Sequence, residues 1–166
     1  MIFISTGSRK FQFDRLLKAL DELVEQGAIQ DKVFAQIAES TYIPKHYEYK
    51  RYLSPEEFSK CQEDAFLIIS HAGTGALIGA LKKEKQVIAV PRLAKYGEHS
   101  DDHQTQISGA LAGEGYLREV LDMEKLGETI SLAYSDPIVK KYDKPSNIVS
   151  IIDEYLSTCI NKGDEK

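Results

Sequence analysis

The sequence predicts a single α/β domain of the doubly wound type, with three layers and a mostly parallel sheet of about six strands. Short runs of apolar and β-branched residues alternate along the chain with segments of helical periodicity. One of these runs, residues 65–69, is apolar at every position, as expected for a strand covered on both faces of a parallel sheet. The length of 166 residues fits one domain.

The first half of the chain contains three predicted strands and two predicted helices. The strands are expected at residues 1–5, 33–38 and, with a weaker pattern, 48–53. After the first strand, one face of a helix that ends near Gly27 collects the apolar residues Phe13, Leu16, Leu17, Leu20 and Val24. A second helix begins after Ser54, because Ser54 can cap it, Pro55 fits its first turn and Glu57 completes a capping box.

The second half continues the alternation. Further strands are expected at residues 65–69, 86–90 and 116–120. The helices are expected around an inward face of Leu77, Ala80 and Leu81, around residues 104–111, and at 122–133 and 145–160. The domain is therefore expected to span residues 1–160, followed by a frayed tail at 161–166.

Composition restricts the possible partners and the compartment. The net charge of −5 argues against broad electrostatic binding to nucleic acid or to an anionic membrane. No apolar run approaches the roughly 20 residues that span a bilayer. The two cysteines, Cys61 and Cys159, form neither a CxxC motif nor a zinc-binding spacing, which favours a reducing, cytoplasmic compartment.

The candidate site lies where the strands end, because open parallel sheets bind ligands beyond the carboxyl ends of their strands. Four segments converge there in the predicted fold: Thr6–Ser8, Tyr52–Ser54, Ser70–Ala76 and Pro91–Gln104. In the third segment, Gly73 and Gly75 lead directly into a helix N-terminus, whose free N–H groups attract anions such as a diphosphate. The same two glycines are also explained by a close strand-to-helix connection alone.

Two common nucleotide motifs do not fit this segment. Gly73, Gly75 and Gly79 are spaced GxGxxxG, follow the fourth strand, and are not followed by an acidic residue at the end of the next strand. A nicotinamide or flavin enzyme is therefore a poor interpretation. The P-loop pattern GxxxxGK[ST] is absent, which disfavours ATP or GTP hydrolysis.

The polar loop after the fifth strand permits two interpretations. Its histidines and carboxylates, His99 and His103 with Glu98, Asp101 and Asp102, look like metal ligands. No single helical face collects three of them, so we expect a solvated loop and no metal. The loop instead suits a polyhydroxylated ligand: Asp102 and Gln104 can bind sugar hydroxyls, and Arg92 or Lys95 can face a phosphate.

Together these segments resemble the donor-binding lobe of GT-B glycosyltransferases, of the glycosyltransferase family 28 C-terminal domain type. The resemblance rests on Phe3–Gly7, Ser70–Gly75, Val87–Arg92, Tyr96–His99 and Asp102–Gln104. More narrowly, the chain looks like the soluble catalytic subunit of split, two-subunit UDP-sugar transferases. These enzymes act in exopolysaccharide and capsule synthesis or add N-acetylglucosamine to a dolichol-linked acceptor.

The resemblance implies a Rossmann-like domain equivalent to the C-terminal half of a GT-B fold, which binds a UDP-sugar without a metal or other cofactor. By position, the backbone near Leu53 would meet the uracil, His71 and the helix start would hold the diphosphate, and Asp102 and Gln104 would hold sugar hydroxyls. With the neighbouring strand ends, the expected donor site comprises Gly7, Ser8, Leu53, His71, Gly73, Thr74, Gly75, Arg92, Glu98, Asp102, His103 and Gln104.

Two positions depart from the family pattern. Ala76 stands where many relatives carry a serine on the phosphate helix, although Thr74 can substitute for that hydroxyl. Gly79 stands where broader GT-B members place a glutamate for the ribose. Contacts to the ribose are therefore less well defined than the fold.

The implied reaction is inverting transfer of one sugar from a UDP-sugar to a lipid-linked saccharide. A membrane-anchored partner subunit would supply the acceptor lobe and recruit the chain to the cytoplasmic face of the membrane. His99 is the favoured general base on this chain, although the base can also belong to the partner. The stripe Ile148, Ile152, Tyr155 and Cys159 of the last helix fits docking on that partner and packing on the chain's own sheet equally well.

Two other functions remain open. The domain fits a non-catalytic UDP-sugar-binding module that activates a partner. It also fits part of a nucleotide-sugar epimerase, although such an enzyme normally has both lobes in one chain.

Overall fold

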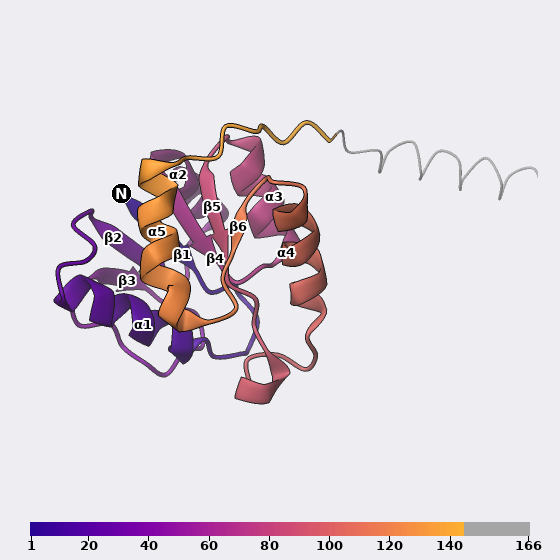
Figure 1. The fold of residues 1–166 in the computed structure, drawn as a ribbon. Coiled ribbons are helices and arrows are strands. Elements are labelled where there is room, and N and C mark those ends of the chain that lie inside the picture. Colours follow the sequence, from indigo (N-terminus) through magenta and orange to yellow (C-terminus); the bar gives the residue numbers. More distant parts are fainter. Residues whose placement is uncertain (145–166) are drawn as a thin grey trace, which may run out of the picture.

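A computed structural model of the chain describes residues 1–144 and contains one six-stranded sheet in the order β3-β2-β1-β4-β5-β6, with every neighbouring pair parallel (Figure 1). The strands are β1 (Ile2–Ser5), β2 (Val33–Gln36), β3 (Glu48–Lys50), β4 (Leu67–Ser70), β5 (Gln86–Ala89) and β6 (Arg118–Glu119). The prediction of a parallel α/β domain is confirmed. The predicted helix at residues 145–160 and the tail at 161–166 lie outside the described residues.

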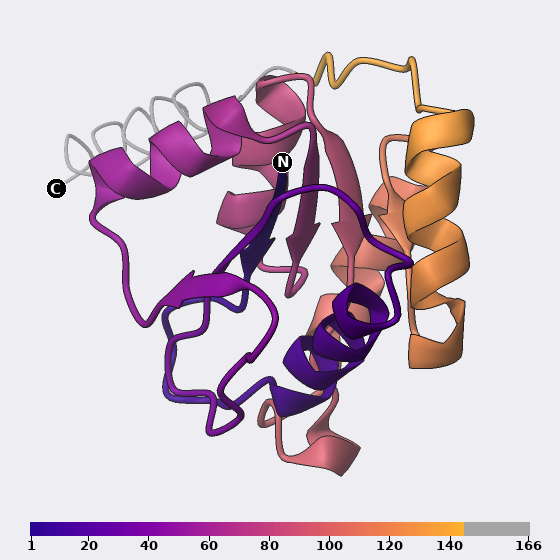
Figure 2. The same cartoon turned by 90° about the vertical axis from the view of Figure 1, so that its left-hand side faces the viewer.

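Helices cover both faces of the sheet and complete the three layers (Figure 2). They are α1 (Asp14–Glu25), α2 (Pro55–Asp64), α3 (Thr74–Lys82), α4 (His103–Gly113) and α5 (Leu126–Ser135), with short 3₁₀ turns η1 (Ala94–Tyr96) and η2 (Met123–Lys125). One apolar core lies between the sheet and α1 with α5. A second core lies between the other face and α2, α3 and α4.

The alternation of side chains along β1 explains why both cores form. Ile2 and Ile4 are fully buried in the core under α1 and α5, and Phe3 is fully buried in the core on the other face. Burial of each such side chain contributes on the order of 1.5–3 kcal/mol to folding. The central strand is therefore anchored on both sides, which holds its carboxyl end in a fixed place.

Several element boundaries differ from the prediction. The fourth strand begins at Leu67, because Ala65 ends α2 and Phe66 is 41% exposed. The last helix of the described chain begins at Leu126, since the side chain of Asp122 accepts from the Glu124 N–H and starts a 3₁₀ turn first. The capping box of α2 is confirmed: Ser54 and Glu57 each accept from the other's backbone N–H.

The two outer strands are short. All three residues of β3 are exposed, and Glu48 in this strand forms an ion pair with Lys32 at 2.9 Å. At the opposite edge, β6 contains only two residues. Within residues 1–144, no helix has both the length and the apolarity needed to cross a bilayer.

Candidate functional site

The loops that follow β1, β4 and β5 meet at the carboxyl edge of the sheet. β1 and β4 are neighbours, and the strand order runs in opposite directions on either side of this pair, so the edge forms a topological switch point. Contacts join the three loops: Gln12 donates to the Tyr96 carbonyl at 2.9 Å, and His71 Nδ1 lies 3.2 Å from the Ser5 carbonyl. Within the predicted segments, Arg92 donates to the Thr6 carbonyl and the ring of His71 packs on Gly7, so three of the four segments are in direct contact.

The N-terminus of α3 is open. Its N-cap is Gly73, which provides no side-chain cap, and the next residues, Thr74 and Gly75, are exposed. Helix α2 shows the contrast, because its own Ser54 side chain fills the corresponding position. First-turn N–H groups without a cap carry partial positive charge and bind anions. The buried Ala72 just before this turn adopts a φ of 59°, a left-handed conformation that costs non-glycine residues about 1–2 kcal/mol.

The ring of His71 is wedged between two glycines. A Cβ atom on Gly73 would lie 2.3 Å from His71 Nε2, and one on Gly7 would lie 2.7 Å from it. The Ser5 carbonyl can only accept a hydrogen bond, so Nδ1 carries the proton and donates to it. Burial first, and the charge of Arg92 second, lower the pKa of His71 to about 4. At neutral pH the ring is therefore uncharged, and its Nε2 lone pair faces the two glycines.

This burial predicts a dependence of stability on pH. The unfolded chain takes up a proton on His71 below its ordinary pKa near 6.5, whereas the folded chain does so only near pH 4. The free energy of unfolding should therefore fall by about 3 kcal/mol between pH 6.5 and 4 through this residue alone. Urea denaturation at several pH values should show a shallower fall in His71→Asn, which keeps an N–H for Ser5. Equal slopes in the two proteins would contradict the assignment.

Arg92 is directed inward. It is 1% exposed, and its guanidinium donates to the carbonyls of Thr6 and, at 3.3 Å, Phe11, both in the loop after β1. Its backbone N–H donates to Gln104 Oε1 at 3.0 Å. Burial lowers its pKa to about 10, so the group stays charged at neutral pH. The sequence suggested that Arg92 or Lys95 faces a phosphate. In the structure, Nη2 of Arg92 joins two loops, and its buried Nε has no hydrogen-bond partner among residues 1–144.

Glu98 has a similar structural role. It is fully buried and forms a bidentate ion pair with Arg15, at 2.9 Å from Arg15 Nε to Oε1 and 3.0 Å from Arg15 Nη2 to Oε2. Oε2 also accepts from the Leu93 N–H at 3.0 Å. Because both oxygens are occupied, this carboxylate fastens the loop after β5 to α1 and has little capacity left for a sugar hydroxyl.

The two residues expected to hold sugar hydroxyls begin the next helix. Asp102 is exposed and is the N-cap residue of α4, and its Oδ1 accepts from the Ala94 N–H at 2.7 Å. Gln104 is 5% exposed, and Arg92 fixes its Oε1. Its Nε2 donates to no other residue in the described part of the chain, so this amide keeps hydrogen-bonding capacity.

The segment expected to meet a uracil is tied to the diphosphate region by Gln36, at the end of β2. Gln36 Oε1 accepts from the Leu53 N–H at 3.3 Å, and Gln36 Nε2 donates to the Gly7 carbonyl at 3.1 Å. Sequence reasoning missed this residue, because a glutamine at the end of an apolar strand belongs to no motif. Through Gln36, Leu53 is linked to the loop after β1, and its role at a uracil stays a prediction.

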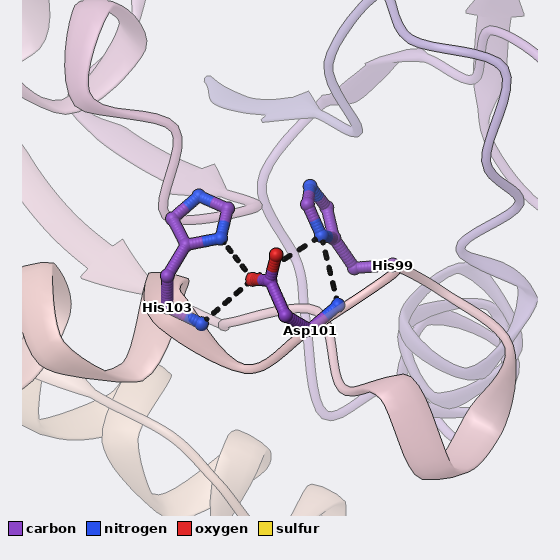
Figure 3. Close-up of side chains that lie close together, drawn as sticks. All are labelled: His99, Asp101 and His103. Carbon is purple, nitrogen blue, oxygen red and sulfur yellow. Dashed lines mark hydrogen bonds and ion pairs between the residues drawn. The ribbon is translucent and has the colours of Figure 1, made fainter.

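His99, Asp101 and His103 form a compact cluster in which both imidazoles point toward the carboxylate (Figure 3). One potential ligand atom from each residue lies within 4.8 Å of the others. The side chain and the backbone N–H of His103 both hydrogen-bond to Asp101, and these bonds lower the pKa of Asp101 to about 2. These hydrogen bonds hold Asp101 and His103 together at the start of α4.

His99 is poorly arranged to act as a base. It is 7% exposed and its ring stacks on Phe11, with centroids 4.9 Å apart. Burial lowers its pKa, and its Nδ1 accepts from the Asp101 N–H at 3.4 Å. In the neutral ring the proton is then on Nε2, which makes His99 a hydrogen-bond donor. Its role as general base stays a prediction.

Arg9 is a cation near the candidate site that the sequence analysis did not consider. It is exposed in the loop after β1, and its charge contributes to lowering the pKa of His71, His99 and Arg92. Ser8, predicted as a donor contact, is exposed in the same loop. One arginine in a loop gives no motif signal, so only the fold reveals that it lies near these residues.

A family model described as "Glycosyltransferase family 28 C-terminal domain" matches residues 1–153. No curated protein matches the chain. Among solved structures, the glycotransferase of kitacinnamycin has a TM-score of 0.62 at 19% identity, with 83% of this chain and 35% of that one covered. The chain thus spans about a third of that enzyme.

Two further solved structures are similar. The solution structure of ALG13 has a TM-score of 0.58 at 16% identity, and the match covers 89% of this chain and 91% of ALG13. Os79 from O. sativa, solved in complex with UDP, has a TM-score of 0.56 at 13% identity, and the match covers 81% of this chain and 32% of Os79. These likenesses show that all four chains share the fold.

Proposed function

Because the chain belongs to the glycosyltransferase family 28 C-terminal domain family, we propose that it is the donor-binding catalytic half of a UDP-sugar glycosyltransferase. In this proposal it transfers one sugar, with inversion, to a lipid-linked saccharide. A membrane-anchored partner subunit supplies the acceptor lobe at the cytoplasmic face of the membrane. The observation that carries the proposal is the uncapped N-terminus of α3 beside the neutral ring of His71.

The open helix end supports recognition of a diphosphate. Each contact between a phosphate and the helix dipole is worth about 0.3–1 kcal/mol when exposed and up to about 2 kcal/mol when partly buried. Thr74, Gly75 and Ala76 are the first residues of α3 and present their N–H groups at its start. Several such contacts together stabilise the charge that develops on UDP as the sugar leaves.

His71 adds a second group to the proposed diphosphate site at the N-terminus of α3. Its Nδ1 is committed to the Ser5 carbonyl, so a phosphate oxygen at Nε2 favours the protonated ring. In the proposal, donor binding therefore raises the pKa of His71 and makes Nε2 a charged donor. The protonation state of His71 would then depend on whether the donor is bound.

The lengths of the relatives support a separate acceptor lobe. The kitacinnamycin enzyme and Os79 are each matched over about a third of their length, whereas ALG13 is matched over 91%. A donor-binding lobe requires a second surface to close over the donor sugar, and the proposal assigns that surface to a partner. The general base is then best sought on the acceptor side, since His99 is held as a donor.

Calorimetry and thermal unfolding with UDP, UDP-sugars and NAD test the proposal. UDP at a hundredfold excess over Kd should stabilise the fold by about 2.7 kcal/mol, or roughly 5–11 °C in Tm for a domain of this size. Gly75→Ala should keep the Tm of the free protein, because a Cβ there meets nothing within 4 Å, and should weaken the UDP response. Stabilisation by NAD and none by UDP would refute the proposal.

A further inference from the structure

Five cationic side chains lie in or beside the loops at the carboxyl edge, and three of them are already engaged. Arg15 is paired with Glu98, Arg92 donates to loop carbonyls, and Lys95 lies 4.8 Å from the centre of the Tyr96 ring. The other two, Arg9 and Lys10, are exposed. Neither forms a hydrogen bond or an ion pair with any residue in the range 1–144.

The fold positions Arg9 between two parts of the site. Two residues before it, Gly7 packs against the ring of His71, and two residues after it, Phe11 stacks on His99. Arg9 therefore lies in the segment of the loop between the residue that contacts His71 and the residue that contacts His99. The charge of Arg9 lowers the pKa of His71, of His99 and of Arg92, whereas Lys10 is not among the causes of these three pKa shifts.

We propose that Arg9 is the guanidinium that pairs with the diphosphate of the bound nucleotide, an inference that rests on the proposed function. The α3 N-terminus supplies only about half a positive charge. The ring of His71 is neutral in the free protein, and the guanidinium of Arg92 is buried, with Nη2 donating to two loop carbonyls and Nε without a hydrogen-bond partner among residues 1–144. Even when donor binding protonates His71, part of the diphosphate charge is left for an exposed cation that has no partner among residues 1–144. Arg9 meets that requirement.

The chemistry of the guanidinium adds specificity. Its planar fork can contact two phosphate oxygens at once, whereas an ammonium group acts as a point charge. Arg9 should therefore distinguish nucleoside diphosphates from monophosphates. A lysine at this position should restore only part of the affinity.

The test is calorimetry with UDP, UMP and uridine on the wild-type protein and on Arg9→Ala, Arg9→Lys and Lys10→Ala. Arg9→Ala should weaken UDP binding on the order of 10- to 100-fold, the range of a charge-assisted bidentate contact. The same substitution should reduce the affinity for UMP by a smaller factor, and it should leave the affinity for uridine at the wild-type value. Lys10→Ala is the matched control, a neighbouring exposed cation, and should change UDP affinity by less than about threefold. Since Arg9 forms no hydrogen bond or ion pair with residues 1–144 and is exposed, its removal should change Tm little.

The outcomes separate the two proposals. If the wild type binds UDP and Arg9→Ala binds it equally well, the inference about Arg9 is wrong and the proposed function stands. The inference would also be overturned if Lys10→Ala lost as much UDP affinity as Arg9→Ala, because that result indicates a nonspecific effect of positive charge. It would likewise be overturned if Arg9→Ala lost as much affinity for uridine as for UDP, because that result indicates a distorted loop. Absence of UDP binding by the wild type would instead refute the proposed function itself.

Discussion

Replacing Gly73 with alanine is expected to destabilise the domain by about 2–4 kcal/mol and to abolish UDP binding. The added Cβ would lie 2.3 Å from His71 Nε2, far inside contact distance. The ring has little freedom to retreat, since Gly7 packs on it and Ser5 holds its Nδ1. Either the ring leaves its place and Nδ1 loses its hydrogen bond to the Ser5 carbonyl, or α3 moves away from the sheet. Urea denaturation measures the loss of stability, and calorimetry measures the loss of binding.

A double-mutant cycle isolates the clash. His71→Ala removes the ring, so Gly73→Ala in that background should have almost no further effect on stability. Gly75→Ala is the control for a methyl group in the same turn, since its Cβ has open space. If Gly73→Ala is equally destabilising with and without His71, the wedge is not the cause of the effect.

Replacing Arg15 with methionine should lower the free energy of unfolding by about 3–5 kcal/mol, because it leaves the fully buried Glu98 carboxylate without its cation. The same change removes a hydrogen bond to the Pro91 carbonyl at 3.2 Å and the contact of the guanidinium with the Tyr96 ring. Hydrogen exchange should accelerate in residues 91–102, which the pair fastens to α1. Thermal unfolding should show a Tm lower by roughly 6–20 °C.

One rescue variant and one control variant test whether the unpaired buried charge causes this loss of stability. Arg15→Met with Glu98→Gln should recover most of the stability, because no charge then remains buried. Lys32→Met breaks the exposed ion pair with Glu48 and should change stability by less than about 1 kcal/mol. Equal, small effects of Arg15→Met and Lys32→Met would show that the buried pair has no special role.

The fold was predictable because its signals are local. The apolar repeat of α1, the capping box at Ser54 and the fully apolar run through Leu67–Ile69 each depend on residues within a few positions of one another. The boundaries were less accurate where competing hydrogen bonds decide them. At the start of α5, for example, one Asp122 side chain selects a 3₁₀ turn.

The candidate site was predictable only where the backbone forms it. Gly73 and its neighbours mark a helix start in the sequence, and in the structure this helix N-terminus has no side-chain cap. The orientation of a charged side chain depends on partners far along the chain: Glu98 turns inward because Arg15, 83 positions earlier, lies opposite it. No local pattern distinguishes such a carboxylate from one that faces a ligand. For the same reason Arg92 was expected to face a phosphate, and Arg9 was overlooked.

The outer strands have a consequence for the behaviour of the isolated domain. An unpaired strand edge invites a strand from another molecule and can seed aggregation. At β3 the incoming strand would meet the charged residues Glu48 and Lys50, which are already paired with Lys32 and Glu57. At the other edge, β6 offers a template of only two residues. Both edges of the sheet are therefore poor templates for strand pairing between copies of the domain.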